Sequence, residues 1–288
     1  MSQVLTLIAA VPPLNPDLVE RVRDIAGGGE PEILARGEAV DIPIPAPPDM
    51  DALAAVLVGT AVDAIATPIA GRRKRLLIAD MDSTIVTGET LDELADFAGL
   101  KDQIAAITRR SMNGEIDFAD ALRERVAMLR GLPLDALEKT WQRVRLTQGA
   151  RELVATMRAH GAVTALVSGG FTFFTARVAV LTGFDAHFAN TLLDDGKALT
   201  GYVAEPILDR DAKLTTLRAL AAEHHLDLAE TLAVGDGAND LAMLRAAGLG
   251  VAFHAKPVLA AEARARVDHG NLRALLFAQG YRAKEITA

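Results

Sequence analysis

The sequence contains no cysteine. Disulfide bonds and thiolate metal sites are therefore excluded, and the absence fits a reducing cytoplasm, which is where we expect the protein. Basic residues are also in the minority, and the net charge of −8 argues against nucleic acid as a partner. An anionic ligand would consequently have to be bound by local groups, because the overall charge does not attract it.

No segment is typical of a membrane span. The most apolar stretch, residues 52–70, is interrupted by Asp63 and Pro68, and its valines, isoleucines and threonines fit a helix followed by a strand. The apolar VLTLIAAV near the start has no Lys or Arg before it, which argues against a signal peptide. With 50% apolar and 24% charged residues, the composition is that of a soluble globular protein without a membrane partner.

Residues 1–70 are expected to form a small α+β domain. The pattern predicts, in order, a strand at 4–10, a helix at 17–25, two strands within 31–44, a helix at 50–58 and a strand at 62–69. This β-α-β-β-α-β succession matches the ferredoxin-like motif. The basic cluster GRRKR at 71–75 is interpreted as a solvated linker.

Residues 76–288 are expected to form a larger α/β core. Apolar runs at 76–79, 163–167, 231–234 and 250–253 alternate with helical segments, which predicts a Rossmann-like, doubly wound parallel sheet. The helical stretch between the first two runs is too long for a simple crossover, so residues 88–147 are interpreted as an inserted helical cap. The segment LLDDGKALTGYV predicts an antiparallel hairpin.

Three polar clusters follow predicted strands directly. They are DMDST from Asp80, SGG from Ser168 and GDGAND from Gly235. Each cluster alone is explained by ordinary turn and capping residues. Ligands of open α/β sheets bind outside the carboxyl ends of the strands, however, so three clusters in one sheet favour a shared site.

A nucleotide-binding loop does not account for these clusters. GDGAND begins like G-x-G-x-x-G, but Asp240 stands where the third glycine belongs and Asp236 lies between the first two. Carboxylates at these positions would repel a pyrophosphate. The chain also contains no G-x-x-x-x-G-K-[ST] motif.

A divalent cation would explain why Asp80 and Asp82 lie so close together. Asp236 can add a third oxygen ligand, and oxygen ligands without sulfur indicate Mg²⁺. A carboxylate at such a metal can act as nucleophile on a phosphate, and a second acid can protonate the leaving oxygen and later activate water.

The phosphoryl oxygens of such a substrate also need cationic and hydrogen-bonding partners. The Ser168 hydroxyl and the Gly169 N–H can donate to them. Lys213 is the expected cation, because it falls in the first turn of a helix, where the macrodipole disfavours positive charge. The alternative is an ordinary solvated surface lysine.

These motifs resemble those of the haloacid dehalogenase superfamily. The wider segments DMDSTIVTGETLDELADFAG, SMNGEIDFADALRERVAMLRGL, VSGGFTFFT and AVGDGANDLAMLRAAGLGVAFHAKP are similar to the phosphoserine phosphatases within it, over about residues 76–280. The resemblance implies Mg²⁺-dependent hydrolysis of O-phospho-L-serine to L-serine and phosphate through an aspartyl-phosphate, the last step of serine biosynthesis.

The resemblance also implies roles for individual residues. Asp80 would be the nucleophile and Asp82 the general acid/base, while Asp80, the main-chain carbonyl of Asp82 and Asp236 would hold Mg²⁺. Asp240 would support the metal ligands, and Asn239 would contact the substrate or its phosphate. Substrate recognition would fall to Glu89, Met112, Phe118 and Arg125.

Physical reasoning supports these last positions unequally. Arg125 lies in the middle of the apolar stripe formed by Phe118, Leu122 and Leu129, where an Arg usually binds a planar anion such as a carboxylate. A structural ion pair within the cap is the alternative.

Glu89 precedes Thr90 and Glu93, whose spacing predicts a capping box, so helix stability would also explain an acid at this point. Only the resemblance assigns it to the ammonium of the substrate. Met112 and Phe118 could equally belong to the core of the cap, and we assign them only an apolar lining.

Alternatives to this function stay open at the level of sequence. A phosphatase or phosphotransferase acting on phosphothreonine or phosphohomoserine would share the same core, and an amino-acid-binding regulatory protein could retain the core without its activity. Residues 1–70 resemble an ACT-like regulatory module, which leaves open amino-acid sensing, formation of a homodimer, or packing alone.

Overall fold

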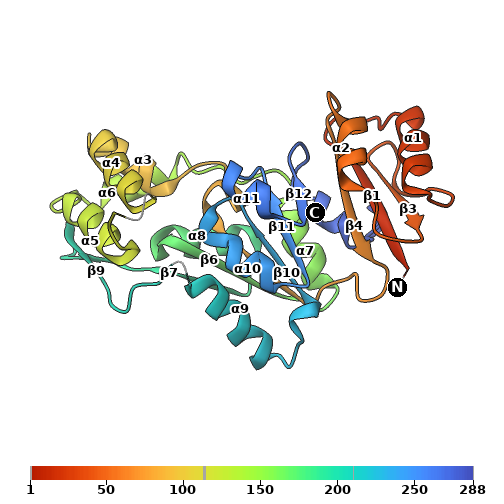
Figure 1. The fold of residues 1–288 in the computed structure, drawn as a ribbon. Coiled ribbons are helices and arrows are strands. Elements are labelled where there is room, and N and C mark those ends of the chain that lie inside the picture. The colour runs from red at the N-terminus through yellow and green to blue at the C-terminus, as the bar shows by residue number, and fades with distance from the viewer. Residues whose placement is uncertain (1, 113–114, 210, 288) are drawn as a thin grey trace.

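The computed structural model describes residues 2–112, 115–209 and 211–287, with the side chain of Met112 outside the description. Figure 1 shows three parts along the long axis of the molecule: a small sheet with two helices at the N-terminal end, a central sheet with helices on both faces, and a group of helices at the far end. The central sheet therefore lies between the other two parts.

The N-terminal part contains the six elements that the sequence predicts, with ends that differ by a residue or two. They are β1 (Gln3–Ala9), α1 (Pro16–Ala26), β2 (Glu32–Ala35), β3 (Ala39–Ile44), α2 (Met50–Leu57) and β4 (Val62–Pro68). The strands form an antiparallel sheet in the order β2-β3-β1-β4. Leu5, Leu7 and Ile42 of this sheet pack against Val22 of α1 and Leu53 of α2 in one apolar core.

The central sheet has six parallel strands in the order β12-β11-β10-β5-β6-β7. Their bounds are β5 (Leu76–Ala79), β6 (Val163–Phe171), β7 (Ala186–Asn190), β10 (Thr231–Gly235), β11 (Leu249–Phe253) and β12 (Ala265–Val267). The four predicted strands are confirmed. The sequence missed β7, whose His and Asn interrupt the apolar pattern, and β12, which is only three residues long.

Side chains alternate between the two faces of this sheet, and helices cover both. Leu77 faces a core shared with α7 (Ala150–Ala159), α8 (Thr172–Thr182) and α12 (Ala274–Ala278). Leu76 and Ile78 face a second core shared with α9 (Ala212–Glu223), α10 (Leu241–Ala246) and α11 (Pro257–Glu262). The predicted doubly wound α/β sheet is therefore confirmed.

The described residues of the stretch interpreted as a cap form four helices joined by turns. The helices are α3 (Thr90–Phe97), α4 (Lys101–Met112), α5 (Phe118–Met128) and α6 (Asp135–Trp141). The predicted hairpin is confirmed as β8 (Leu192–Asp194) and β9 (Leu199–Val203), and β9 packs against α5. A bridge between Val86 and Leu146 joins the segments that lead into and out of the helices. Short 3₁₀ turns occur at Leu228–Glu230, Ala238–Asp240 and Ala283–Glu285.

The interpretation of residues 71–75 as a solvated linker is wrong for Arg72. Its guanidinium pairs with Asp41 of β3 at 2.5 Å and donates to the main-chain oxygens of Phe277 and Ala278 at 3.0 and 2.8 Å. Its side chain is only 12% exposed. Arg72 therefore fastens the N-terminal sheet to the C-terminal helix α12, and sequence patterns cannot show a partner so far away in the chain.

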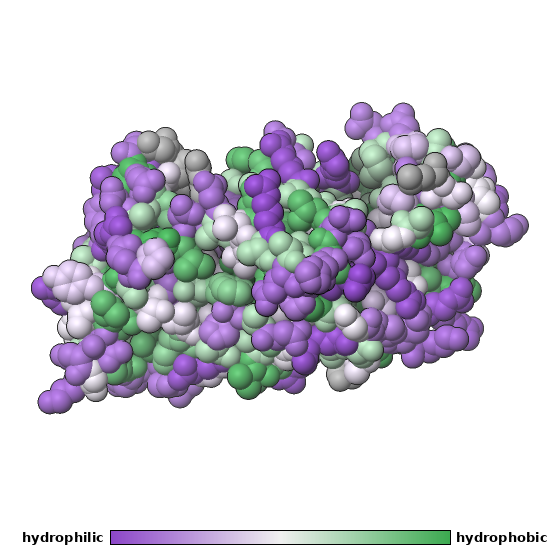
Figure 2. Space-filling model, turned by 90° about the horizontal axis from the view of Figure 1, so that it is seen from below, coloured by the Kyte–Doolittle hydropathy of each residue, from purple (hydrophilic) through white to green (hydrophobic). Residues whose placement is uncertain are grey.

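On the face shown in Figure 2, hydrophobic and hydrophilic residues are interspersed. Within the described residues, none of the helices is both long and apolar enough to cross a bilayer.

Candidate active site

The three predicted polar clusters meet at one edge of the central sheet. Asp80 follows β5, Asp236 follows β10, and Ser168 lies in β6, which pairs with β5 on its other side. Because these strands are parallel neighbours, their carboxyl ends bring the clusters together. One carboxylate oxygen from each of Asp80, Asp236 and Asp240 lies within 4.8 Å of the others, and all three residues are buried.

Lys213 joins two of these acids. Its Nζ lies 2.7 Å from Oδ1 of Asp80 and 2.6 Å from Oδ1 of Asp240, and the residue is 3% exposed. The alternative of a solvated surface lysine is therefore wrong. Burial alone would lower the pKa of Lys213, but the carboxylates of Asp240 and Asp80 outweigh it and raise the pKa, so the ammonium stays charged.

Asp80 is held in a fixed orientation. Its Oδ1 accepts the Met81 N–H at 2.8 Å as well as the Lys213 ammonium, and both contacts leave Oδ2 available. Burial raises the pKa of Asp80 well above its usual value and the nearby charge of Asp240 raises it further, while Lys213 acts in the opposite direction. A cation beside Oδ2 would favour the charged form.

The carboxylate of Asp82 is not part of the acidic cluster of Asp80, Asp236 and Asp240. Its Oδ1 accepts the Thr90 N–H at 2.7 Å, and its Oδ2 accepts the Ser168 hydroxyl at 3.1 Å. Burial and, after it, the charge of Glu89 raise the pKa of Asp82 to about 6, against the effect of the hydrogen bonds from Thr90 and Ser168. A carboxyl group that titrates near neutral pH can both give and take a proton.

The SGG segment packs tightly around Asp82. The sequence places it after the strand, whereas β6 continues through it to Phe171 with a shift in register. The Ser168 hydroxyl accepts the Gly170 N–H at 2.9 Å. A Cβ on Gly170 would lie 3.0 Å from Ser168 Oγ and 3.1 Å from Asp82 Oδ2, so only glycine leaves these two side chains undisturbed.

Glu89 is the N-cap of α3, but it makes no side-chain capping bond. The predicted capping box between Thr90 and Glu93 is wrong, because Glu93 pairs with Arg143 at 3.2 Å and, among the described residues, the hydroxyl of Thr90 has no hydrogen-bond partner. Oε1 of Glu89 instead accepts the hydroxyl of Ser83 at 2.8 Å. Helix capping therefore does not explain this acid.

Lys256 also reaches Glu89, and sequence reasoning missed this residue. Its Nζ lies 3.0 Å from Oδ2 of Asp236 and 3.4 Å from Oε1 of Glu89. Burial alone would lower the pKa of Lys256, but Asp236 and Glu89 outweigh it and raise the pKa. The sequence did contain a signal for Lys256. This residue immediately precedes the helix α11, where the macrodipole disfavours a cation, as it does at Lys213.

Arg125 and Phe118 face the site from the cap. Arg125 is half-buried in the predicted stripe, and its Nε donates to the Ala121 carbonyl at 3.1 Å. Burial lowers the pKa of Arg125, against the opposing effect of the nearby charges of Asp92 and then Glu89. The ring of Phe118 lies against Gly169, whose added Cβ would be 3.3 Å from Cζ. Within the described residues Arg125 has no ion pair.

Two other predicted residues are less defined. Met112 ends α4, but its side chain lies outside the described residues. Asn239 is exposed, in the 3₁₀ turn between Asp236 and Asp240.

Comparisons with known proteins agree with this arrangement. The profile of the haloacid dehalogenase-like hydrolases matches residues 77–245, more than half of the chain. The chain belongs to this family.

Several relatives of this chain share a name. A phosphoserine phosphatase of Archaeoglobus fulgidus is 44% identical over 201 residues, which cover 70% of this chain and 58% of the relative. One of Lactococcus lactis is 43% identical over 203 residues, covering 70% and 94%. The structure of a probable phosphoserine phosphatase from Vibrio cholerae is 31% identical with a TM-score of 0.81, covering 99% and 88%. The chain spans somewhat more than half the length of several curated relatives that it matches.

The residues of the candidate site fit a divalent cation. Asp240 is an unsuitable direct ligand, because its Oδ1 accepts Lys213 and its Oδ2 accepts the Gly237 N–H at 3.0 Å. In contrast, the contacts among the described residues do not occupy both carboxylate oxygens of Asp80 or of Asp236. Clustered buried carboxylates with spare oxygens are the donor set that Mg²⁺ prefers.

Proposed function

We propose that the chain is a Mg²⁺-dependent phosphoserine phosphatase, which hydrolyses O-phospho-L-serine to L-serine and phosphate. The observation that carries the proposal is the buried set of Asp80, Lys213, Asp240 and Asp236 at the carboxyl edge of the sheet, with Asp82 beside it. The names of relatives that are more than 40% identical to this chain over the aligned residues support the choice of substrate.

We assign the metal to Asp80, Asp236 and the main-chain carbonyl of Asp82. When bound, Mg²⁺ would neutralise the charge of the phosphoryl group and of the carboxylates around it. Asp240 would hold Lys213 and the Gly237 N–H in place without contacting the metal. Lys213 would then orient Oδ1 of Asp80, so that Oδ2 faces the substrate.

In the first chemical step, an oxygen of Asp80 attacks phosphorus and the bond between phosphorus and the serine oxygen breaks. The serine oxygen takes its proton from Asp82, whose pKa of about 6 keeps a fraction of the group protonated near neutral pH. The products of this step are L-serine and a phosphorylated Asp80.

In the second step, water attacks the phosphorus of the aspartyl-phosphate. The carboxylate of Asp82 takes a proton from this water, and the bond between phosphorus and Asp80 breaks. Phosphate leaves, and Asp80 and Asp82 return to their starting states. The hydrogen bond from the Thr90 N–H keeps Asp82 in position through both steps. The Ser168 hydroxyl, which donates its single proton to Asp82 in the free site, would turn to the phosphoryl group when substrate binds.

Lys213, the Ser168 hydroxyl and the Gly169 N–H would stabilise the phosphoryl oxygens, with Asn239 at the exposed side. Glu89 would bind the ammonium of the substrate and Arg125 its carboxylate, because a guanidinium matches a planar carboxylate. Phe118 and Met112 would line the space between them.

We further propose that residues 1–70 are a separate domain of the ferredoxin-like, ACT-like type, followed by a connecting segment at 71–75 and the phosphatase core at 76–288 with its cap at about 88–147. The strand order β2-β3-β1-β4 supports this division. A homodimer and a cytoplasmic location stay predictions from the sequence.

Phosphate release from a panel of phosphomonoesters tests the proposal. The panel contains L- and D-phosphoserine, phosphothreonine, phosphoethanolamine and 3-phosphoglycerate, each with Mg²⁺ and with EDTA. We expect metal-dependent turnover with a strong preference for L-phosphoserine. Equal rates across the panel would contradict the roles of Glu89 and Arg125, and preference for phosphothreonine would replace the substrate.

A further inference from the structure

Lys256 lies outside the polar clusters that form the rest of the site. It stands at the start of α11, a helix of six residues, and not at the end of a sheet strand. Its ammonium nevertheless contacts two acids that belong to different parts of the molecule. Asp236 follows the central strand β10, whereas Glu89 opens the first helix of the cap.

The orientation of Lys256 is not the one expected of a surface lysine. Its side chain is 52% exposed, so its ammonium could extend into water. It points instead at Asp236, which is 4% exposed. The main chain is bound to the same residue, because the Lys256 N–H donates to the carbonyl of Asp236 at 2.9 Å. Two separate contacts therefore hold Lys256 to one acid of the proposed metal site.

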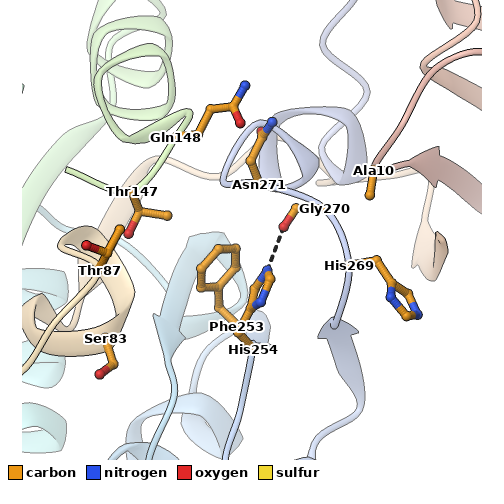
Figure 3. Close-up of a pocket in the computed structure, with 10 residues that line it drawn as sticks. All are labelled: Ala10, Ser83, Thr87, Thr147, Gln148, Phe253, His254, His269, Gly270 and Asn271. Atoms are coloured by element: carbon orange, nitrogen blue, oxygen red, sulfur yellow. Dashed lines mark hydrogen bonds between the residues drawn. The ribbon is translucent and has the colours of Figure 1, made fainter. Parts of the chain in front are cut away.

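The turn before Lys256 is supported from the N-terminal part of the molecule. His254 adopts a left-handed conformation with φ 44°, and its N–H donates to the Val267 carbonyl at 2.8 Å. Figure 3 shows its ring facing the carbonyl of Gly270, 2.7 Å from Nε2. Asp63 of β4 accepts the N–H of Gly270 at 2.7 Å and that of Asp268 at 2.8 Å.

A hollow of about 360 Å³ lies beside this turn. Figure 3 shows that its wall includes Phe253 and His254 on one side and Ser83 and Thr87 on another. The hollow does not contain the acidic cluster, but Ser83 binds Glu89 and His254 leads into Lys256. Ser83 and the turn that leads to Lys256 thus border the same hollow.

We propose that Lys256 is a built-in cation that competes with Mg²⁺ for Asp236. This inference rests on the proposed metal site. Without metal, its ammonium neutralises Asp236 and links it to Glu89, which keeps the mouth of the cap close to the sheet. A divalent cation at Asp236 repels this ammonium, so each binding event includes the cost of weakening the contact between Lys256 and Asp236.

The competition has a second consequence at Glu89. One ammonium serves both acids, so a metal at Asp236 removes the nearer of its two partners, at 3.0 Å, and leaves the weaker contact at 3.4 Å. The displaced ammonium keeps Glu89 as its acidic partner, so the metal moves Lys256 away from Asp236 without releasing it from Glu89.

Isothermal titration of the metal-free full-length protein with MgCl₂ tests the inference. In Lys256→Met the competitor is gone, and we expect Mg²⁺ to bind about tenfold more tightly, equivalent to ~1.4 kcal/mol. Lys256→Arg keeps the charge and should bind as the unmodified protein does. Lys197→Met removes the same charge from an exposed turn between β8 and β9 and controls for net charge.

Lys256→Gln provides a second neutral variant, with a polar group against Asp236, should the methionine variant fail to fold. Thermal unfolding gives an independent readout, because the neutral variants should gain more stability from a fixed Mg²⁺ concentration than the unmodified protein gains. Unchanged or weaker Mg²⁺ binding in both neutral variants would overturn this inference alone. Failure of every protein to bind Mg²⁺ would overturn the proposed metal site together with it.

Discussion

Lys213 Nζ lies 2.7 Å from Oδ1 of Asp80, and the two side chains are only 3% and 8% exposed. A buried lysine is stable only when carboxylates compensate its lost hydration, and Asp240 supplies the second one. The pair fixes one oxygen of Asp80 and leaves the other for chemistry.

Asp80→Asn should abolish turnover without unfolding the protein. The amide is nearly the same size and still accepts from Lys213, but it cannot form an aspartyl-phosphate. We expect a loss of at least ~10³-fold in kcat for phosphoserine, measured by phosphate release, with an unchanged circular dichroism spectrum. Asp24→Asn, at an exposed position of α1, is the matched control. Residual activity near that of the control would refute the role of Asp80.

Gly170→Ala should reduce activity, because its Cβ would lie 3.0 Å from Ser168 Oγ and 3.1 Å from Asp82 Oδ2. Either side chain must shift, and a small displacement of a reacting group can lower kcat by ~10- to 100-fold. Gly88→Ala is the control, because no atom lies within 4 Å of its Cβ. Steady-state kinetics of the two variants should therefore differ, and equal kcat values would show that the SGG segment tolerates a Cβ.

Arg125→Met should weaken the selectivity for substrates that carry a carboxylate. We expect the preference for phosphoserine over phosphoethanolamine, measured as the ratio of kcat/KM values, to fall by ~10- to 100-fold, because a charge-assisted hydrogen bond to the carboxylate is lost. Arg123→Met, on the same helix but paired with Asp120 and Glu205 at the surface, should keep the preference. An unaltered ratio in Arg125→Met would assign Arg125 to the structure of the cap.

The stability of the metal-free protein should depend on the ionisation of Asp82. Its pKa of about 6 in the folded protein exceeds the ordinary value of 3.8, so the folded state binds more protons than the unfolded chain between these values. The contribution of this group is therefore present at low pH and is lost as pH rises through about 6.

Urea denaturation at pH 5 and pH 7.5 measures this effect. Asp82→Asn lacks the titrating group, so its unfolding free energy should fall less over this interval than that of the unmodified protein, by about 1 kcal/mol. Parallel changes in the two proteins would show that the pKa of Asp82 is not raised.

Asp63→Asn should destabilise the junction between the N-terminal sheet and the core. The Asp63 carboxylate is buried and accepts the N–H groups of Asp268, His269 and Gly270, whereas an amide directs its own N–H toward at least one of them. We expect a loss of ~2 kcal/mol in the free energy of unfolding, measured in urea. Asp51→Asn, exposed on α2, is the control, and equal midpoints for the two variants would exclude a stabilising role for Asp63.

Sequence patterns were sufficient where a local rule decides the structure. Apolar runs predicted four of the six central strands, and polar residues directly after them placed Asp80, Ser168 and Asp236 at one edge. The unfavourable helix position of Lys213 predicted a buried cation. The same argument applied to Lys256 would have found that residue too.

Sequence patterns failed where a distant partner decides. Glu93 has the spacing of a capping box, but its carboxylate pairs with Arg143, fifty residues later in the chain. Arg72 belongs to a basic cluster, yet Asp41 and the end of α12 bury it. Local propensity is a weak guide wherever tertiary contacts offer a charged group a better partner.

The most direct test of the central claim is the identification of the phosphorylated residue. The full-length protein is mixed with L-phosphoserine and Mg²⁺, quenched in acid during turnover, digested and analysed by mass spectrometry. We expect a phosphoryl group on Asp80 in the peptide that begins at Leu76, and none when EDTA replaces Mg²⁺. Turnover without a phosphorylated peptide, or with the phosphoryl group on another residue, would contradict the account.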